Sequence, residues 1–148
     1  MKLAVGCDHG GFQVAESLRA HLKEKGIDYA DFGTHSTDSV DYPLIALKVA
    51  KAVSGGEADF GVLVCSTGIG ISIAANKVKG IRAAVVTNEL CAGLTRKDND
   101  ANVLCMGGKV VDGETAVKIL DTFIHTEFEG GRHARRVGQI TDIEAGKL

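Results

Sequence analysis

Short apolar runs rich in valine, isoleucine and leucine alternate along this chain with longer stretches of helical periodicity. The runs cover residues 2–6, 27–32, 60–65, 81–86 and 102–106. Near-continuous apolar strands that alternate with helices are typical of a parallel sheet covered by helices on both faces. The sequence therefore predicts an α/β fold, a doubly wound three-layer α/β/α sandwich around a five-stranded parallel sheet.

The intervening stretches have the apolar spacing of amphipathic helices. Residues 12–25 place Phe12, Ala15, Leu18 and Leu22 on one stripe, and Gly26 is a typical helix-ending glycine. Further helices are predicted over residues 42–53, 69–78, 90–97 and 114–127, with an extra C-terminal helix over residues 132–144. Because every connection is short and no repeat is visible, we expect a single domain over residues 1–148.

Composition excludes several classes of protein. Hydrophobic residues make up 45% and charged residues 24%, as in ordinary globular chains, and the net charge of −2 gives no footprint for nucleic acid. No stretch approaches the roughly 20 apolar residues of a membrane span, and the N-terminus turns polar too soon for a signal peptide. We therefore expect a cytoplasmic protein with neither membrane nor nucleic-acid partners.

The four cysteines are scattered without any C-x-x-C pair. This spacing disfavours a cysteine-based zinc site, a thioredoxin-like motif and a disulfide framework. Each cysteine must therefore be judged by its own surroundings, and Cys7 is expected in the core.

The strongest local signal is VLVCSTGIGIS at residues 62–72, where a buried strand enters a glycine-rich turn and then a helix. Gly68 and Gly70 let the backbone approach a ligand, and free N–H groups at a helix start favour negative charge. A thiol there, Cys65, suits a base or nucleophile. The alternative is that Cys65 is only a small buried apolar residue, but the flanking STGIG favours a functional role.

Several named motifs do not fit this turn. It lacks the Lys-Ser/Thr of an ATP-binding loop and the third glycine of a dinucleotide-binding fingerprint. A cysteine phosphatase would need arginine where Ile71 stands. ATP, NAD and phosphatase chemistry are therefore disfavoured.

Polar residues elsewhere are candidates for the same site. Asp8 and His9 follow the first strand and would lie near Cys65 if the first and third strands are neighbours, although a helix cap and a loop histidine are the simpler interpretations. The segment TRKDNDANV at residues 95–103 is either a solvated turn or a site. Arg132 and Arg136, four residues apart on a helix face, could grip a phosphate or form a solvated basic face.

Taken together, these motifs resemble the type B ribose-5-phosphate isomerase and galactose-6-phosphate isomerase family. The resemblance is carried by GCDHGGF, DYP, GEAD, CSTGIGISIAANKVKGIRAA, NDANVL and FEGGRHARRV, in that order along nearly the whole chain. It implies a Rossmann-like sandwich that interconverts aldose and ketose phosphosugars without metal or organic cofactor. It also implies a homodimer or homotetramer with the site between subunits.

The resemblance assigns roles by position. Cys65 corresponds to the base that moves a proton between C1 and C2, Thr67 helps to position the reacting oxygens, and backbone amides stabilise an enediolate. Those amides belong to Ser66, Thr67, Gly68, Ile69 and Gly70. Substrate contacts are expected from Asp8, His9 and Asn99, and phosphate contacts from Arg132, Arg136 and Lys109, with His9 an alternative phosphate ligand.

Three positions depart from the family pattern. Asp98 stands where pentose-phosphate members have the histidine credited with opening the furanose ring, and an ionised aspartate is a poor acid near neutral pH. Lys109 replaces an arginine, which keeps the charge but loses the bidentate fork. Ser66 replaces a glycine, which changes the pocket shape.

The Asp98 substitution leaves the substrate open. Ribose 5-phosphate is the expected substrate, with Asp98 acting in ring opening or His9 compensating. A tetrose 4-phosphate cannot form the five-membered ring and needs no ring-opening acid, and a hexose 6-phosphate is a further possibility. An inactive phosphosugar-binding subunit or regulator also fits the substitution, whereas a flavodoxin-like electron carrier is disfavoured by the 5% aromatic content.

Overall fold

A parallel five-stranded sheet forms the centre of the molecule in the computed structural model, which describes residues 1–148. The strand order is β2-β1-β3-β5-β4. The strands are β1 (Lys2–Cys7), β2 (Asp28–Asp31), β3 (Phe60–Cys65), β4 (Ala83–Val85) and β5 (Val103–Gly107). The predicted doubly wound three-layer α/β/α sandwich is confirmed.

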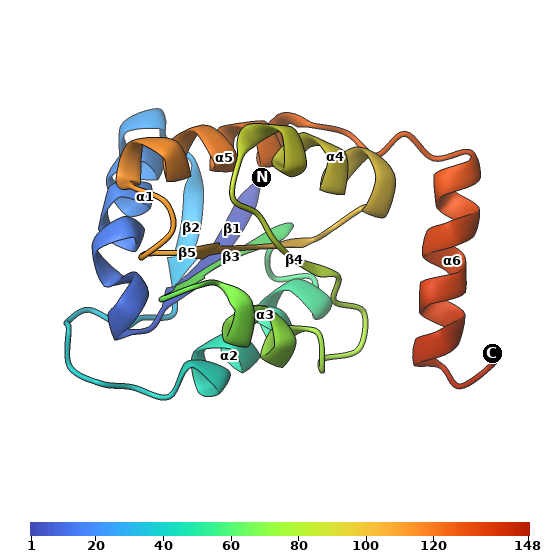
Figure 1. Ribbon diagram of the computed structural model, residues 1–148, viewed down its shortest axis with the longest axis horizontal. Helices are drawn as coiled ribbons and strands as arrows, with labels where there is room; N and C mark the ends of the chain where they lie inside the picture. Colours follow the sequence, from blue (N-terminus) through green and yellow to red (C-terminus); the bar gives the residue numbers. More distant parts are fainter.

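Helices cover both faces of this sheet (Figure 1). On one face lie α1 (Phe12–Lys25), α4 (Glu89–Asn99) and α5 (Gly113–His125). On the other face lie α2 (Tyr42–Ser54) and α3 (Ile69–Ala75). The last helix, α6 (Arg132–Glu144), belongs to neither layer, because it stands across one end of the sandwich, where it contacts α4.

The alternation of side chains along the strands creates two separate cores. Leu3, Val5 and Cys7 of β1 pack toward α1 and α5, whereas Leu63 and Cys65 of β3 pack toward α2 and α3. All five side chains are at most 5% exposed. A strand buried on both faces explains why its sequence is an apolar run instead of an alternation of apolar and polar residues.

Most predicted elements occur with small shifts at their ends, and residues 12–25, 60–65 and 132–144 match the observed elements without any shift. The helix predicted over residues 69–78 is wrong at its end, because α3 stops at Ala75. The side chain of Asn76 makes two hydrogen bonds with the backbone of Ala83, of 2.8 and 3.0 Å, which turn the chain into β4. The N–H groups of Lys77 and Val78 bond to carbonyls three residues earlier, so the chain leaves α3 through a tighter turn.

Helix α4 is longer than the predicted 90–97. It includes Asp98 and Asn99 and is capped by Asp100, which adopts the left-handed conformation at φ 46°. The buried Arg96 donates to the Asp100 carboxylate at 2.8 Å and to the Ala101 carbonyl at 2.6 Å. The first part of the polar segment 95–103 is therefore helical and ordered, and the simple interpretation as a solvated turn is wrong for it.

Strands β1 and β3 are neighbours, as the grouping of Asp8 and His9 with Cys65 required. From β1 the chain goes outward to β2, whereas β3 and all later strands lie on the other side. The carboxyl ends of β1 and β3 therefore flank the switch point where ligands bind in open α/β sheets. None of the helices is long and apolar enough to cross a membrane.

Candidate active site

Three central strands end together and bring their following loops into contact. In the parallel register, Cys65 at the end of β3 lies opposite Gly107 of β5, and Cys7 of β1 lies opposite Val64. The Gly108 N–H donates to the Cys65 carbonyl at 2.7 Å, and the Lys109 N–H donates to the Ser66 carbonyl at 2.9 Å. The loops after β3 and β5 are therefore tied together directly behind the glycine-rich turn.

Cys65 lies at the centre of this edge. Its side chain is largely buried, and the Gly68 N–H donates to its Sγ at 3.1 Å. Gly68 adopts φ 82°, a left-handed conformation that an L side chain rarely adopts, and this turn aims its N–H at the sulfur. A buried backbone donor of this kind stabilises negative charge that accumulates on sulfur.

The other cysteines have different surroundings. Burial raises the pKa of the Cys105 thiol strongly. Burial also raises the pKa of the Cys7 thiol, against the lowering effect of the neighbouring Arg19 guanidinium. Cys91 is exposed on α4, on the outside of the sandwich. Cys65 is therefore the cysteine placed to act as a base at the carboxyl edge of the sheet.

Close backbone packing explains why glycines line this edge. A Cβ on Gly107 would lie 2.6 Å from the carbonyl carbon of Thr67, and a Cβ on Gly68 would lie 2.9 Å from that of Met106. Both distances are shorter than real Cβ contacts. The turn at residues 66–70 can therefore lie against β5 only because both positions lack a side chain.

Asp8 and His9 lie beside this turn. The buried Asp8 carboxylate accepts hydrogen bonds from the N–H groups of Gly10 and Gly11, at 2.9 and 3.1 Å, and so caps a short 3-10 helix, η1 (His9–Gly11). His9 is exposed, and its Nδ1 accepts from the Val40 N–H at 3.2 Å. The capping interpretation of Asp8 is correct, and the cap places His9 at the mouth of the site.

A polar cavity of about 730 Å³ opens next to His9. It is lined by His9 and Lys109, together with Gln13, Ser17 and Thr37. The cavity therefore offers an imidazole, an ammonium group, an amide and two hydroxyl groups to an anionic ligand.

Some side chains at this edge were not predicted as site residues from the sequence. Tyr42 lies against the start of α3, where a Cβ on Gly70 would meet its ring at 2.8 Å. The motif DYP contains this tyrosine, but nothing in the sequence says that α2 begins beside the glycine-rich turn. Gln13 and Thr37, which line the cavity, carry no sequence signal of their own.

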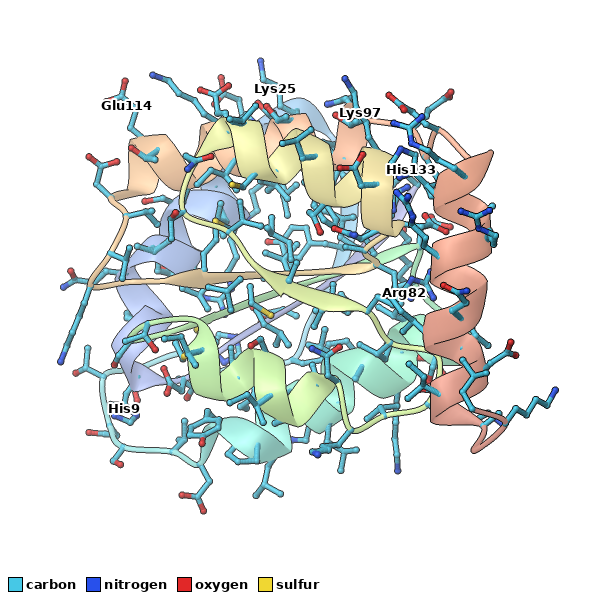
Figure 2. The ribbon with its side chains drawn as sticks, turned by 45° about the vertical axis from the view of Figure 1, so that its right-hand side comes forward. His9, Lys25, Arg82, Lys97, Glu114 and His133 are labelled. Atoms are coloured by element: carbon cyan, nitrogen blue, oxygen red, sulfur yellow. The ribbon has the colours of Figure 1, made fainter.

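The remaining predicted residues lie elsewhere in the chain. Asp98 and Asn99 end α4, and Arg132 and Arg136 belong to α6. Because α4 runs back across the sheet, its last turn lies at the amino ends of the strands, next to Asn102, which precedes β5. Figure 2 shows His9 and His133 at opposite ends of the molecule. Within one chain, therefore, Cys65 does not meet the predicted arginine pair.

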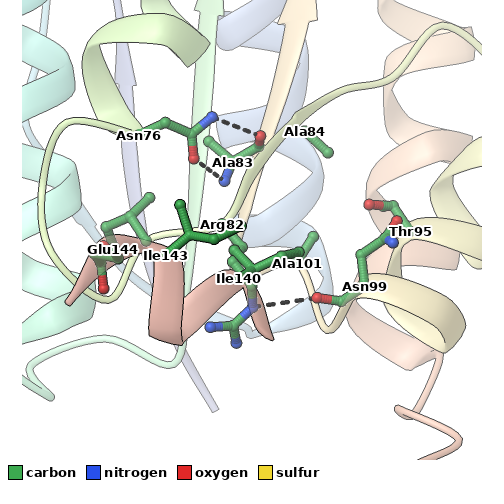
Figure 3. Close-up of a pocket in the computed structure, with 11 residues that line it drawn as sticks. Asn76, Arg82, Ala83, Ala84, Thr95, Asn99, Ala101, Ile140, Ile143 and Glu144 are labelled. Carbon is green, nitrogen blue, oxygen red and sulfur yellow. Dashed lines mark hydrogen bonds between the residues drawn. The ribbon is translucent and has the colours of Figure 1, made fainter. Parts of the chain in front are cut away.

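A second cavity of about 480 Å³ lies at the α6 end of the molecule (Figure 3). It is lined by Ile140 and Ile143 of α6 and by Arg82 and Asn99. Arg82 Nε donates to the Asn99 carbonyl at 3.2 Å. The Glu144 carboxylate accepts from the Gly80 N–H at 3.0 Å and fixes the far end of the helix. The helix is thus held at both ends over an apolar hollow.

One group of side chains has metal-ligand character. Asp98, Glu129 and His133 bring their ligand atoms within 4.8 Å of one another at the junction of α4 and α6. This group lies far from Cys65 of the same chain.

Fold and site together define a small α/β enzyme with a thiol and a glycine-rich turn at the carboxyl edge of its sheet. Residues 3–140 match the family model described as Ribose/Galactose Isomerase. The chain belongs to this family of sugar-phosphate isomerases, as the sequence motifs predicted.

Individual relatives match along nearly their whole length. Ribose-5-phosphate isomerase B of Escherichia coli is 51% identical over 143 residues, which are 97% of this chain and 96% of the relative. A solved structure of Clostridium thermocellum ribose-5-phosphate isomerase B is 52% identical, covers 100% of both chains and has a TM-score of 0.97. The Mycoplasma genitalium enzyme, solved with bound ribulose 5-phosphate, is 40% identical with a TM-score of 0.92 and covers 97% of this chain and 96% of its own.

Proposed function

We propose that the chain interconverts ribose 5-phosphate and ribulose 5-phosphate in the cytoplasm, as a single domain over residues 1–148. The observation that carries this proposal is the thiol of Cys65, held at the sheet edge with the Gly68 N–H 3.1 Å from its sulfur. The relatives named above, one of them solved with ribulose 5-phosphate, support the same substrate.

The proposed chemistry needs no metal or organic cofactor. The Cys65 thiolate removes the proton from C2 of the open-chain aldose while electrons move into the C1 carbonyl, which gives an enediolate. The hydroxyl proton passes from O2 to O1 as the thiol returns the first proton to C1, and the C2 carbonyl of the ketose forms. The Gly68 N–H is engaged with the Cys65 sulfur, and the other N–H groups of residues 66–70 stabilise the charge that develops on the oxygens, which the exposed Thr67 hydroxyl positions.

A second copy of the chain is proposed to complete the site. Asp8, His9, Cys65 and Lys109 lie at one end of the molecule, whereas Asp98, Asn99, Arg132 and Arg136 lie at the other. A homodimer or homotetramer in which the α4–α6 end of one subunit meets the carboxyl edge of its partner unites the two groups. The arginines of the α4–α6 end then bind the phosphate in the partner subunit's site by charge-assisted hydrogen bonds.

Exposed apolar side chains support such an assembly. They surround the open β4 edge of the sheet, and they are Ile69 and Ile73 on α3, Val85 on β4, and Leu90 and Leu94 on α4. Each is between 39% and 70% exposed. Apolar groups gathered around an unpaired edge strand are typical of an interface.

Asp98 favours a second candidate within the same reaction class. Its carboxylate is partly exposed and cannot donate a proton while ionised. A tetrose 4-phosphate requires no ring opening, and a hexose 6-phosphate would have to open its ring with other groups. An inactive phosphosugar-binding subunit is the candidate from a different class.

Proton NMR in heavy water tests these functions, with ribose 5-phosphate and erythrose 4-phosphate followed side by side. We expect turnover of the pentose with deuterium incorporation at the carbon that exchanges its proton. Turnover of the tetrose alone would establish the second candidate. Cys65→Ala should lose turnover by orders of magnitude and still bind phosphosugar, whereas turnover that survives this change would refute Cys65 as the base.

A further inference from the structure

His133 is a buried histidine whose ring nitrogen lacks a hydrogen-bond partner. It is the only buried residue of α6, its side chain is 9% exposed, and its Nε2 atom is fully shielded from solvent without a donor or acceptor in bonding range. Removing a polar nitrogen from water without compensation is costly. The surroundings of Nε2 must therefore supply something that compensates it.

Two carboxylates face this nitrogen from different parts of the chain. Asp98 Oδ1 lies 3.6 Å and Glu129 Oε2 lies 3.7 Å from His133 Nε2. Both distances exceed those of hydrogen bonds. They are close to the roughly 3.3–3.5 Å that separates ligand atoms around a tetrahedral zinc ion with bonds of about 2.0–2.1 Å.

The three ligands are held in place by the surrounding backbone. The Glu129 N–H donates to the Lys97 carbonyl at 3.2 Å, which ties the segment before α6 to the last turn of α4. Arg96 Nε donates to the Thr126 carbonyl at 3.2 Å and anchors the same segment. The cluster is therefore preorganised from two ordered helix ends and one tethered segment. Closing it around an ion requires the ligand atoms, which lie within 4.8 Å of one another, to approach to about 3.3–3.5 Å.

We propose that Asp98, Glu129 and His133 form a binding site for a divalent transition-metal ion of the zinc type. One imidazole and two carboxylates suit Zn²⁺, whereas Mg²⁺ and Ca²⁺ prefer oxygen ligands alone. The partly exposed carboxylates, with side chains 41% and 53% exposed, leave a path for the ion and room for water at the fourth position.

Occupation of this site would fix α6 against α4. That helix stands apart from the two layers of the sandwich and is otherwise held chiefly by contact with α4 and by Glu144 at its far end. The ion would therefore control the placement of the helix that carries Arg132 and Arg136. The binding proposal itself does not depend on the proposed isomerase function, because metal affinity is measured without substrate.

A Zn²⁺ titration against a chromophoric chelator tests the site. The titration uses Cys91→Ala protein, because an exposed thiol also binds zinc. We expect one ion per chain with micromolar or tighter affinity and no competition from a large excess of Mg²⁺. In this background Asp98→Asn and Glu129→Gln should each weaken binding at least about tenfold, and both are exposed enough to fold normally.

Asp121→Asn is the matched control, because it removes the carboxylate of another His–Asp pair, His21 Nε2 to Asp121 Oδ1 at 2.8 Å, which lacks a third ligand. Its zinc affinity should equal that of the parent protein.

Hydrogen exchange gives a second readout, in which Zn²⁺ slows exchange over residues 132–144 in the parent but not in Glu129→Gln. The proposal is overturned if the parent does not bind zinc. Equal affinities in the parent and the Asp98 and Glu129 variants would overturn it as well.

Discussion

At the scale of single residues, Gly107 determines how the glycine-rich turn at residues 66–70 packs. A Cβ at this position would lie 2.6 Å from the Thr67 carbonyl carbon, and backbone cannot move aside as a flexible side chain can. Gly107→Ala should therefore destabilise the fold by about 1–3 kcal/mol and reduce kcat. Gly93→Ala is the control, because its Cβ would meet Thr122 at an ordinary 3.6 Å within α4, where alanine favours the helix by about 0.5–1 kcal/mol. Urea unfolding compares the two, and equal stabilities would contradict the packing argument.

Asp31 links a single carboxylate to acid stability. Burial raises the pKa of this carboxyl, but the Gly33 N–H, His35 and the Arg19 guanidinium together outweigh burial, and the pKa lies below its usual range. A lowered folded-state pKa contributes stability that is complete above the unfolded value of about 3.9 and is lost as pH falls through the folded value.

Asp31→Asn should therefore lower the free energy of unfolding at pH 7 and flatten its decline below about pH 4. Denaturant unfolding between pH 7 and pH 3 measures both effects. Asp28→Asn, which removes an exposed carboxylate of the same strand, should leave the profile unchanged. An Asp31→Asn profile that declines in parallel with the parent would show that Asp31 is not linked to acid unfolding.

At the scale of secondary-structure elements, α6 is the one helix whose removal should spare the fold. His133 is its only buried residue, so a chain that ends at Gly131 keeps both hydrophobic cores intact. The truncation also removes Arg132 and Arg136. With about 1.5–3 kcal/mol for each charged hydrogen bond, kcat/KM should fall by at least about a hundredfold.

Thermal unfolding and steady-state kinetics together check this separation of fold and function. A chain that ends at Ala145 loses only the residues after α6 and should behave as the parent does. Collapse of the thermal transition in the Gly131 truncation would show that α6 supports the fold itself. Retained kcat/KM would remove the arginine pair from the site.

The sequence predicted the elements well where a single local rule determines them. Gly26 ends α1 in the left-handed conformation at φ 68°, as a helix-ending glycine should. The last two residues of α4 were missed because the helix end depends on Arg96, a charged residue expected in solvent, whose side chain is instead buried against the Asp100 carboxylate and the Ala101 carbonyl. Arg96 Nε also donates to the carbonyl of Thr126, thirty residues further along the chain, and a long-range contact of this kind leaves no periodic trace in the sequence.

The site, like the elements, was predictable from the sequence where a single local pattern determines it. Cys65 and the glycine-rich turn are contiguous in sequence, so their grouping required only one strand–turn–helix pattern. Tyr42 reaches the turn from another element through packing between α2 and α3, which no local pattern encodes. The orientation of α6 was equally beyond local patterns, because the spacing of Ile140 and Ile143 defines an apolar side of the helix but does not say which surface of the molecule that side faces.

At the scale of the whole molecule, the distance between Cys65 and the arginines is the decisive property. One chain places the thiol at the carboxyl ends of the strands and α6 at their amino ends. A site that needs both groups must be shared between subunits. In an assembly with twofold symmetry, each of the two equivalent sites then takes its thiol from one chain and its arginines from the other.

Subunit mixing tests this arrangement directly. Cys65→Ala and Arg132→Ala proteins, each nearly inactive alone, are mixed in equal amounts and allowed to exchange subunits. Half of the resulting dimers are hybrids, and in each hybrid one site is fully native while the other carries both substitutions, so about a quarter of native activity should return. A mixture of Cys65→Ala with Cys65→Ala/Arg132→Ala protein contains no native site and should stay inactive. If each site instead lay within one chain, every hybrid would keep two singly damaged sites and mixing would restore nothing.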